Sequence, residues 1–200
     1  MPQEPRIHGW TKLLCFVCLG FLFAIPGEIL NQLLSRQDPR GFRNTMISYF
    51  VLLVIGYFAG MALRAVVKRR ALAALLFYLL FGCLGLSVEW FLLGNAPVAD
   101  LLQLVTQPGM FSFWGTMLLG PCLLMEGSDF ARLKRAFLTF YLCFCALYLG
   151  VALAVPRARG GIFFGFIIFV AGSASLNYFY VKYFRLLATR GAAFTRVHAA

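Results

Sequence analysis

Six long runs without a charged residue divide this 200-residue chain, and they constrain its fold more than any other feature. A helix needs about 20 mostly apolar residues to cross the hydrocarbon core of a bilayer, at about 1.5 Å of rise per residue. Five runs are long enough, and the first becomes so if Glu28 is carried into the membrane, because apolar residues resume at Ile29. The runs are 13–27, 44–63, 71–88, 101–125, 136–156 and 160–181. The sequence therefore predicts an all-α, polytopic integral membrane protein, a bundle of six transmembrane helices.

The composition agrees with a single transmembrane domain over 1–200. Apolar residues make up 62% of the chain and charged residues 12%, against about 45–50% and about 25% in average globular proteins. Pro97 and Pro108 bracket a segment with apolar residues at helical spacing, which predicts a short amphipathic helix at the interface between spans three and four. The predicted spans are about 10–34, 45–66, 71–93, 109–125, 136–155 and 161–184, followed by a tail over 186–200.

The basic residues predict the orientation of the chain. With six spans, thirteen Lys and Arg fall on the side of the two termini and five fall on the other side. Lys and Arg are enriched in cytoplasmic loops, so both termini are predicted to be cytoplasmic, in a cytoplasmic (inner) membrane. Arg outnumbers Lys fourteen to four, which hints at a GC-rich bacterial source. The net charge of +11 is thus explained by topology and by anionic headgroups, and nucleic acid is not an expected partner.

The sequence lacks the residues that several kinds of cofactor, metal or catalytic site need. The two histidines, His8 and His198, lie in terminal tails, which disfavours a haem, a histidine metal site or a serine–histidine hydrolase within the bundle. The Cys15–Cys18 pair is one turn of an apolar helix without a second pair at ligand spacing, and we interpret it as apolar filler. No cofactor or metal is expected, no catalytic residue is identified, and a role other than enzyme is favoured without an enzyme being excluded.

Two acids in the membrane are the candidate site. Glu28 lies about 24 Å along span one from Lys12, and Glu89 lies about 28 Å along span three from Arg70, so both carboxyls are predicted in the outer third of the bilayer. Acidic side chains inside a membrane are rare and mark functional sites by default. Pro26, just before Glu28, is expected to open the helix there, as in the broken helices of transporters.

The faces of these two helices suggest the rest of the site. Helical spacing puts Asn31 and Gln32 on the side of Glu28, and it puts Gly85 and Gly82 on the side of Glu89, a small-residue stripe that should face another helix. The predicted ligand-binding residues are Glu28, Asn31, Gln32, Glu89 and Trp90. An alternative is structural: Glu28 pairs with an outer arginine such as Arg36, Arg40 or Arg43, and Glu89 caps the loop at Asn95.

Three functions stay open from the sequence. The first is a small membrane transport or ligand-binding protein whose acidic site takes a cation, a proton or a cationic or lipidic small molecule. The second is a non-catalytic integral subunit or accessory protein of a larger membrane complex; size and topology are similar to the substrate-binding subunits of vitamin-importing ATPase complexes, an analogy of fold without a motif. The third is a lipid-modifying membrane enzyme that uses paired carboxylates. Expected partners are membrane lipids, a small-molecule or cation ligand, and a membrane protein or a second copy of this chain.

Overall fold

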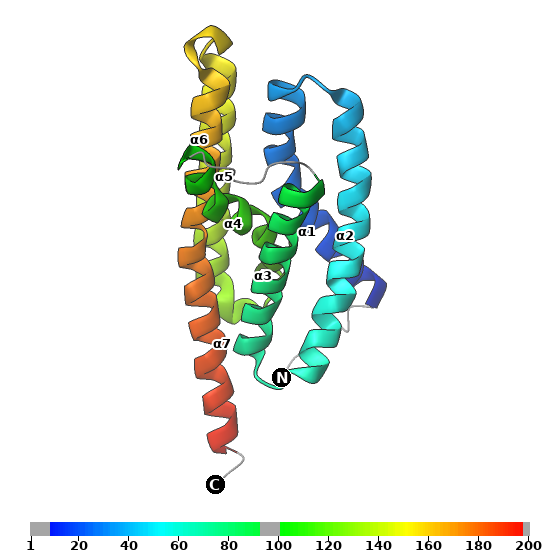
Figure 1. Cartoon of the computed structure of the whole chain (residues 1–200). Helices are drawn as coiled ribbons and strands as arrows, with labels where there is room; N and C mark the ends of the chain where they lie inside the picture. Colours follow the sequence, from blue (N-terminus) through cyan, green and yellow to red (C-terminus); the bar gives the residue numbers. More distant parts are fainter. Residues whose placement is uncertain (1–8, 93–100, 198–200) are drawn as a thin grey trace.

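The computed structural model describes residues 9–92 and 101–197, and within these ranges every regular element is helical (Figure 1). α1 (Gly9–Glu28) continues as a π-helical segment, η1 (Ile29–Ser35), and α3 (Arg70–Ser87) continues in the same way as η2 (Val88–Leu92). The other long helices are α2 (Pro39–Val66), α4 (Leu101–Leu124), α5 (Ala131–Ala154), α6 (Gly161–Ser175) and α7 (Asn177–Val197). Two single 3-10 turns join them, η3 (Ser128–Phe130) before α5 and η4 (Arg157–Arg159) before α6.

Five of these helical stretches are long and apolar enough to cross a membrane. They are Gly9–Ser35, Pro39–Val66, Arg70–Phe91, Ser128–Ala154 and Gly161–Thr189. The last stretch joins α6 and α7, which run on as one rod past Leu176 in Figure 1. This confirms the prediction of an all-helical, multi-pass membrane protein, and α4 is the helix that corresponds to the remaining predicted span.

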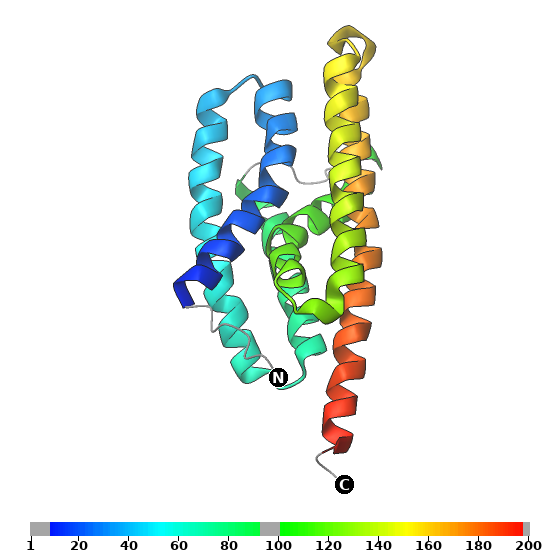
Figure 2. The same cartoon turned by 180° about the vertical axis from the view of Figure 1, so that it is seen from behind.

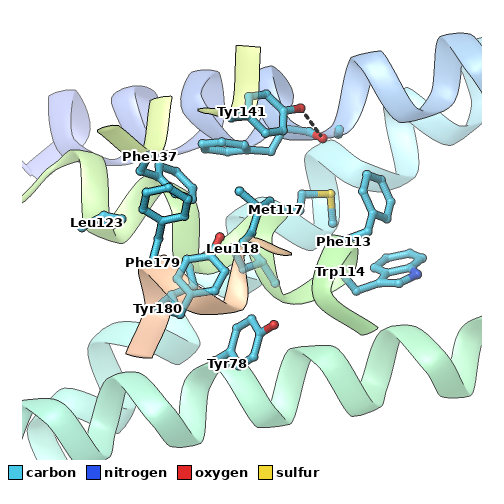
Figure 3. Close-up of a cluster of buried hydrophobic side chains, with 14 of the residues drawn as sticks. Tyr78, Phe113, Trp114, Met117, Leu118, Leu123, Phe137, Tyr141, Phe179 and Tyr180 are labelled. Atoms are coloured by element: carbon cyan, nitrogen blue, oxygen red, sulfur yellow. Dashed lines mark hydrogen bonds between the residues drawn. The ribbon is translucent and has the colours of Figure 1, made fainter. Parts of the chain in front are cut away.

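α4 lies inside the bundle, where it packs against α1, α3 and α6. Met117 and Leu118 on this helix are fully buried, and so is the hydroxyl-bearing Ser112. Figure 3 shows Met117 and Leu118 surrounded by aromatic side chains from neighbouring helices, among them Phe137 and Tyr180. Such an enclosed helix needs less apolar surface than a helix that faces lipid on one side.

Small residues let α4 approach its neighbours. A Cβ on Gly82 or Gly85 of α3 would overlap Phe111 or Trp114 of α4, so the predicted small-residue stripe does face another helix. On α2, a Cβ on Gly56 would lie 2.5 Å from Leu118. Close backbone approach of this kind is how helices pack where the surrounding lipid is as apolar as the side chains.

The turn between η1 and α2 is shorter than the sequence suggests. Asp38 caps α2 by accepting a 2.9 Å hydrogen bond from the backbone N–H of Gly41, and Pro39 occupies the first helical position, where no N–H is needed. α2 therefore begins at Pro39 and includes Arg40 and Arg43, which the sequence placed in a loop. The helix extends beyond its predicted span, which starts at about residue 45.

Pro26 does not open its helix at the place that the sequence predicts. α1 runs through Pro26 without an interruption, and the change of winding comes after it, at Ile29. Figure 2 shows α1 bending before it continues as η1. The amphipathic segment predicted at 97–108 lies partly outside the described residues, and its described part, 101–108, forms the first turns of α4.

The helices alternate in direction, so α1 begins and α7 ends in the lower half of Figure 1. The turn η1–α2 and the turn η4–α6 lie at the opposite end, at the top of the view. Gly160 makes the second of these turns in the left-handed conformation, at φ 83°, which glycine adopts without steric cost.

Candidate functional site

Both membrane acids are buried inside the bundle. Glu28, the last residue of α1, is 6% exposed, and Glu89, in η2, is 7% exposed. Neither side chain faces lipid. A carboxyl buried in a membrane protein needs hydrogen-bond donors, because the apolar surroundings do not solvate it.

Glu28 finds its donor on α2. The buried Tyr49 hydroxyl donates a 2.6 Å hydrogen bond to Glu28 Oε1. Glu28 Oε2 is also buried, and among the described residues it has no hydrogen-bond partner. Tyr49 therefore holds one oxygen of this carboxyl, and the half-buried Gln32 side chain also lies close enough to interact with the carboxyl.

Glu89 is held from α4. The Trp114 indole N–H donates a 3.2 Å hydrogen bond to Glu89 Oε1, and Trp114 itself is 5% exposed. The absence of a side chain at Gly85, one turn before Glu89, leaves the space that the indole occupies. The predicted stripe on α3 thus positions the group that binds the acid.

The two donors connect the two acids. The rings of Tyr49 and Trp114 meet edge to face, with centroids 5.6 Å apart at 88°. Glu28 and Glu89 are close enough to interact electrostatically. We call these four residues, Glu28, Tyr49, Trp114 and Glu89, the acid pair site. It is built from α1, α2, α4 and η2, so it exists only when the bundle is assembled.

Such a site suits a positive charge. Two carboxylates within electrostatic range repel one another in a medium of low dielectric, and binding of a proton or a cation at either one reduces that repulsion. The donors are a phenol and an indole, which are neutral, and Glu28 has no ion pair among the described residues. No arginine lies within salt-bridge distance of Glu28 among the described residues, although Arg36 is within electrostatic range of it. The Asn95 loop lies outside the described residues.

The other predicted site residues are spread out. Asn31 is exposed and lines a separate cavity with Ser35, while the half-buried Gln32 lies near Glu28 and near Gly41 on α2. Trp90 donates a 2.8 Å hydrogen bond from its indole N–H to Gln107 Oε1. The structure thus brings together Glu28, Glu89 and Gln32, and does not bring Asn31 to the acid pair site.

The π winding of η1 explains the position of Asn31. A π-helix has hydrogen bonds to the fifth residue, so residues three and seven positions apart no longer share a face as they do in an α-helix. The sequence reasoning used α-helical spacing and therefore put Asn31 beside Glu28.

Tyr49 and Trp114 were missed by the sequence reasoning, which looked for charged groups. A signal exists: buried Tyr and Trp carry one polar atom that usually finds a partner, and both residues stand in charge-free runs. The sequence does not say which acid each of them meets.

Two further polar clusters have a structural role. Asn177 donates a 2.7 Å hydrogen bond to Ser112 and accepts one from Tyr78, so it joins α7 to α4 and α3, as expected for polar contacts between helices. Glu126, after α4, accepts hydrogen bonds from Arg70 at 3.0 Å and from Tyr183 at 2.8 Å. Glu126 is thus a half-buried acid with a salt-bridge partner, unlike Glu28.

The described residues contain no group of three or more His, Cys, Asp or Glu side chains that could hold a metal ion. The six cysteines are free, and Cys15 and Cys18 are exposed on the apolar surface of α1. Two carboxylates and a phenol therefore make up the charged and ionisable groups of the acid pair site.

Comparison of the chain with protein-family models, with curated proteins and with solved structures finds no match. Function therefore has to be inferred from the geometry of the acid pair site.

Proposed function

We propose that this protein is a small membrane transport or ligand-binding protein whose acid pair site takes a cation, a proton or a cationic or lipidic small molecule. The observation that carries the proposal is the burial of Glu28 and Glu89 within electrostatic range of each other, with no salt bridge to Glu28 among the described residues. Glu126, by contrast, has Arg70 as a cationic partner for both of its carboxylate oxygens.

The energetic cost supports a function for the pair. An ionised side chain at the centre of a bilayer costs roughly 3 kcal/mol on insertion scales, and less near the interface. A pair of like charges adds repulsion to that cost. A membrane bundle held together by small-residue contacts and by the Asn177 network has no structural need for this arrangement.

The orientation is part of the proposal. The thirteen-to-five split of basic residues favours cytoplasmic termini in the inner membrane of a bacterium. α1 begins and α7 ends in the lower half of Figure 1, as an even number of spans requires, and the choice of the cytoplasmic side rests on the basic residues. With that orientation the acid pair site lies in the outer third of the bilayer, on the path of a solute that enters from outside.

The proposal is tested by thermal unfolding of the detergent-solubilised protein with Na⁺, K⁺ or a quaternary ammonium ion, at several pH values. We expect at least one cation to raise the melting temperature of the wild type, and to do so less at low pH, because protons compete for the carboxylates. Glu28→Gln and Glu89→Gln should remove the cation effect. Glu126→Gln is the matched control, since it makes the same change at a half-buried acid outside the site, and it should keep the effect.

Absence of a cation effect would favour the second function, that of an integral subunit or accessory protein of a larger complex. If no cation stabilises the wild type and both site variants lower the melting temperature at every pH, the acids are structural. An integral subunit or accessory protein of a larger membrane complex then becomes the better interpretation. Co-purification from mild detergent would show that partner.

A further inference from the structure

A cavity separate from the acid pair site lies at the turn end of the bundle, between η1, η4 and the start of α6. Its volume is about 510 Å³. It is lined by Leu30, Asn31, Ser35, Arg157, Gly160, Ile162, Phe163 and Phe166. The π winding of η1 turns Asn31 and Ser35 toward this cavity, whereas Glu28, just before η1, hydrogen-bonds to α2.

The polar side of the cavity is electropositive. Arg157 is exposed and donates a 2.7 Å hydrogen bond from Nη2 to the Leu34 carbonyl, and the Gln37 side-chain amide also lies against the guanidinium, so the group is fixed beside η1. Among the described residues Arg157 forms no salt bridge, and those that line the cavity include no Asp or Glu. Asn31 and Ser35 add neutral hydrogen-bonding groups on the facing wall.

The helix α6 adds to the positive potential. Its first turn includes Ile162 and Phe163, which line the cavity; the Gly161 N–H is bonded to the Pro156 carbonyl, whereas the N–H groups of Ile162 and Phe163 have no carbonyl partner within the helix. A helix N-terminus and an arginine together are a favourable arrangement for an anion, above all for a phosphate group.

The other side of the cavity is apolar and opens toward the membrane-facing surface. Leu30, Phe163 and Phe166 line it, and Phe163 is 48% exposed on α6. A ligand that fits must therefore have an anionic head for Arg157 and an apolar chain for the phenylalanines.

We propose that this cavity binds an anionic phospholipid, with the headgroup phosphate at Arg157 and the start of α6, and with an acyl chain along Phe163 and Phe166. This also gives a role to an arginine on the side of the protein that carries few basic residues. The site is independent of the acid pair site and does not require the proposed transport or binding function.

Native mass spectrometry of the protein in detergent tests this proposal, with bound lipids counted during titration with phosphatidylglycerol or phosphatidylcholine. We expect the wild type to retain one phosphatidylglycerol in preference to phosphatidylcholine. Arg157→Gln should weaken that retention by about tenfold, as expected for one charge-assisted contact. Arg159→Gln, two residues away and outside the cavity lining, is the matched control and should leave retention unchanged.

Arg157→Gln also removes the hydrogen bond to the Leu34 carbonyl, so it could weaken lipid binding by changing the fold. A second variant separates these two effects. Asn31→Asp changes an exposed residue by one charge and almost no volume, and it should weaken phosphatidylglycerol retention. Asn44→Asp, at an exposed position on α2, makes the same change outside the cavity lining and should have no effect.

Two results would overturn the proposal. Equal retention of phosphatidylglycerol by the wild type, Arg157→Gln and Asn31→Asp would show that the lipid does not use this cavity. Displacement of phosphatidylglycerol by inorganic phosphate at matched concentration would show that the cavity takes free phosphate and that the lipid chain contributes nothing.

Discussion

Tyr49 donates the hydrogen bond that stabilises the buried Glu28 carboxyl. Its hydroxyl supplies the 2.6 Å hydrogen bond to Oε1, and Oε2 has no partner among the described residues. Tyr49→Phe therefore removes the hydrogen bond while it keeps the ring that packs on Trp114. Hydrogen bonds to charged groups contribute about 1.5–3 kcal/mol, so the free energy of unfolding should fall by about that amount.

A double-mutant cycle makes this prediction specific. When Glu28 is already glutamine, the acceptor is uncharged, and the further change Tyr49→Phe should cost clearly less than it does in the wild type. The measurement is the melting temperature of the four proteins in the same detergent. Additive effects in the cycle would contradict a direct Tyr49–Glu28 hydrogen bond.

Gly85 controls the position of Trp114. A Cβ at this position would overlap the base of the indole, which is buried and cannot swing away. Gly85→Ala should therefore lower the free energy of unfolding by about 1–3 kcal/mol and shift the tryptophan fluorescence spectrum. Gly150→Ala in α5 is the control: nothing lies within 4 Å of its Cβ, so it should be neutral or slightly stabilising. Equal effects of the two changes would place Trp114 elsewhere.

At the scale of the elements, the positions of the helices could be predicted from the sequence, but the change from α-helical to π-helical winding could not. Charge-free runs of the right length mark where helices cross the membrane, and the stripe of Gly82 and Gly85 marks the face of α3 that meets α4. The change to π winding at Ile29 depends on how η1 meets its neighbours α2 and α6, which no local pattern reports. For the same reason the sequence put Asn31 beside Glu28, whereas the structure has it lining a separate cavity with Ser35 and Arg157.

The Gly56–Gly60 motif on α2 gives a prediction at this scale. The two glycines contact different helices: Gly56 faces Leu118 of the buried α4, and a Cβ on Gly60 would lie 3.2 Å from Phe77 of α3. Leu118 is fully buried and has no room to move, so Gly56→Ala should lower the melting temperature more than Gly60→Ala. Gly60→Leu should also be destabilising, because the close approach of α2 and α3 is lost. Unchanged melting curves would mean that this face of α2 lies toward lipid.

At the scale of the whole molecule, the sequence predicts the number of spans and the structure supplies their arrangement. Five stretches are apolar enough to be recognised alone, whereas α4 contains Gln107, Pro108 and Thr116 and is enclosed by its neighbours. The pairing of Glu28 with Glu89 follows from that enclosure, since α4 delivers Trp114 and α2 delivers Tyr49 to the same place. Chain order alone does not specify which helices meet.

The proposed orientation can be tested on intact cells. Ala158, in η4, and Ser128, in η3, are exposed and lie in loops that six spans would put on opposite sides of the membrane. In a cysteine-free background, Ala158→Cys should react with an impermeant thiol reagent added outside, and Ser128→Cys should react only after the membrane is broken. Reaction of Ser128→Cys from outside, with Ala158→Cys protected, would reverse the orientation.

The central claim is that Glu28 and Glu89 act as one site for positive charge. Infrared difference spectroscopy of the reconstituted protein, recorded on adding the cation that stabilises it, observes the carboxyl groups directly. We expect carboxyl difference bands in the wild type and in Glu126→Gln, and loss of the bands in both Glu28→Gln and Glu89→Gln. Bands that persist in both site variants, or a wild-type spectrum without carboxyl bands, would contradict it.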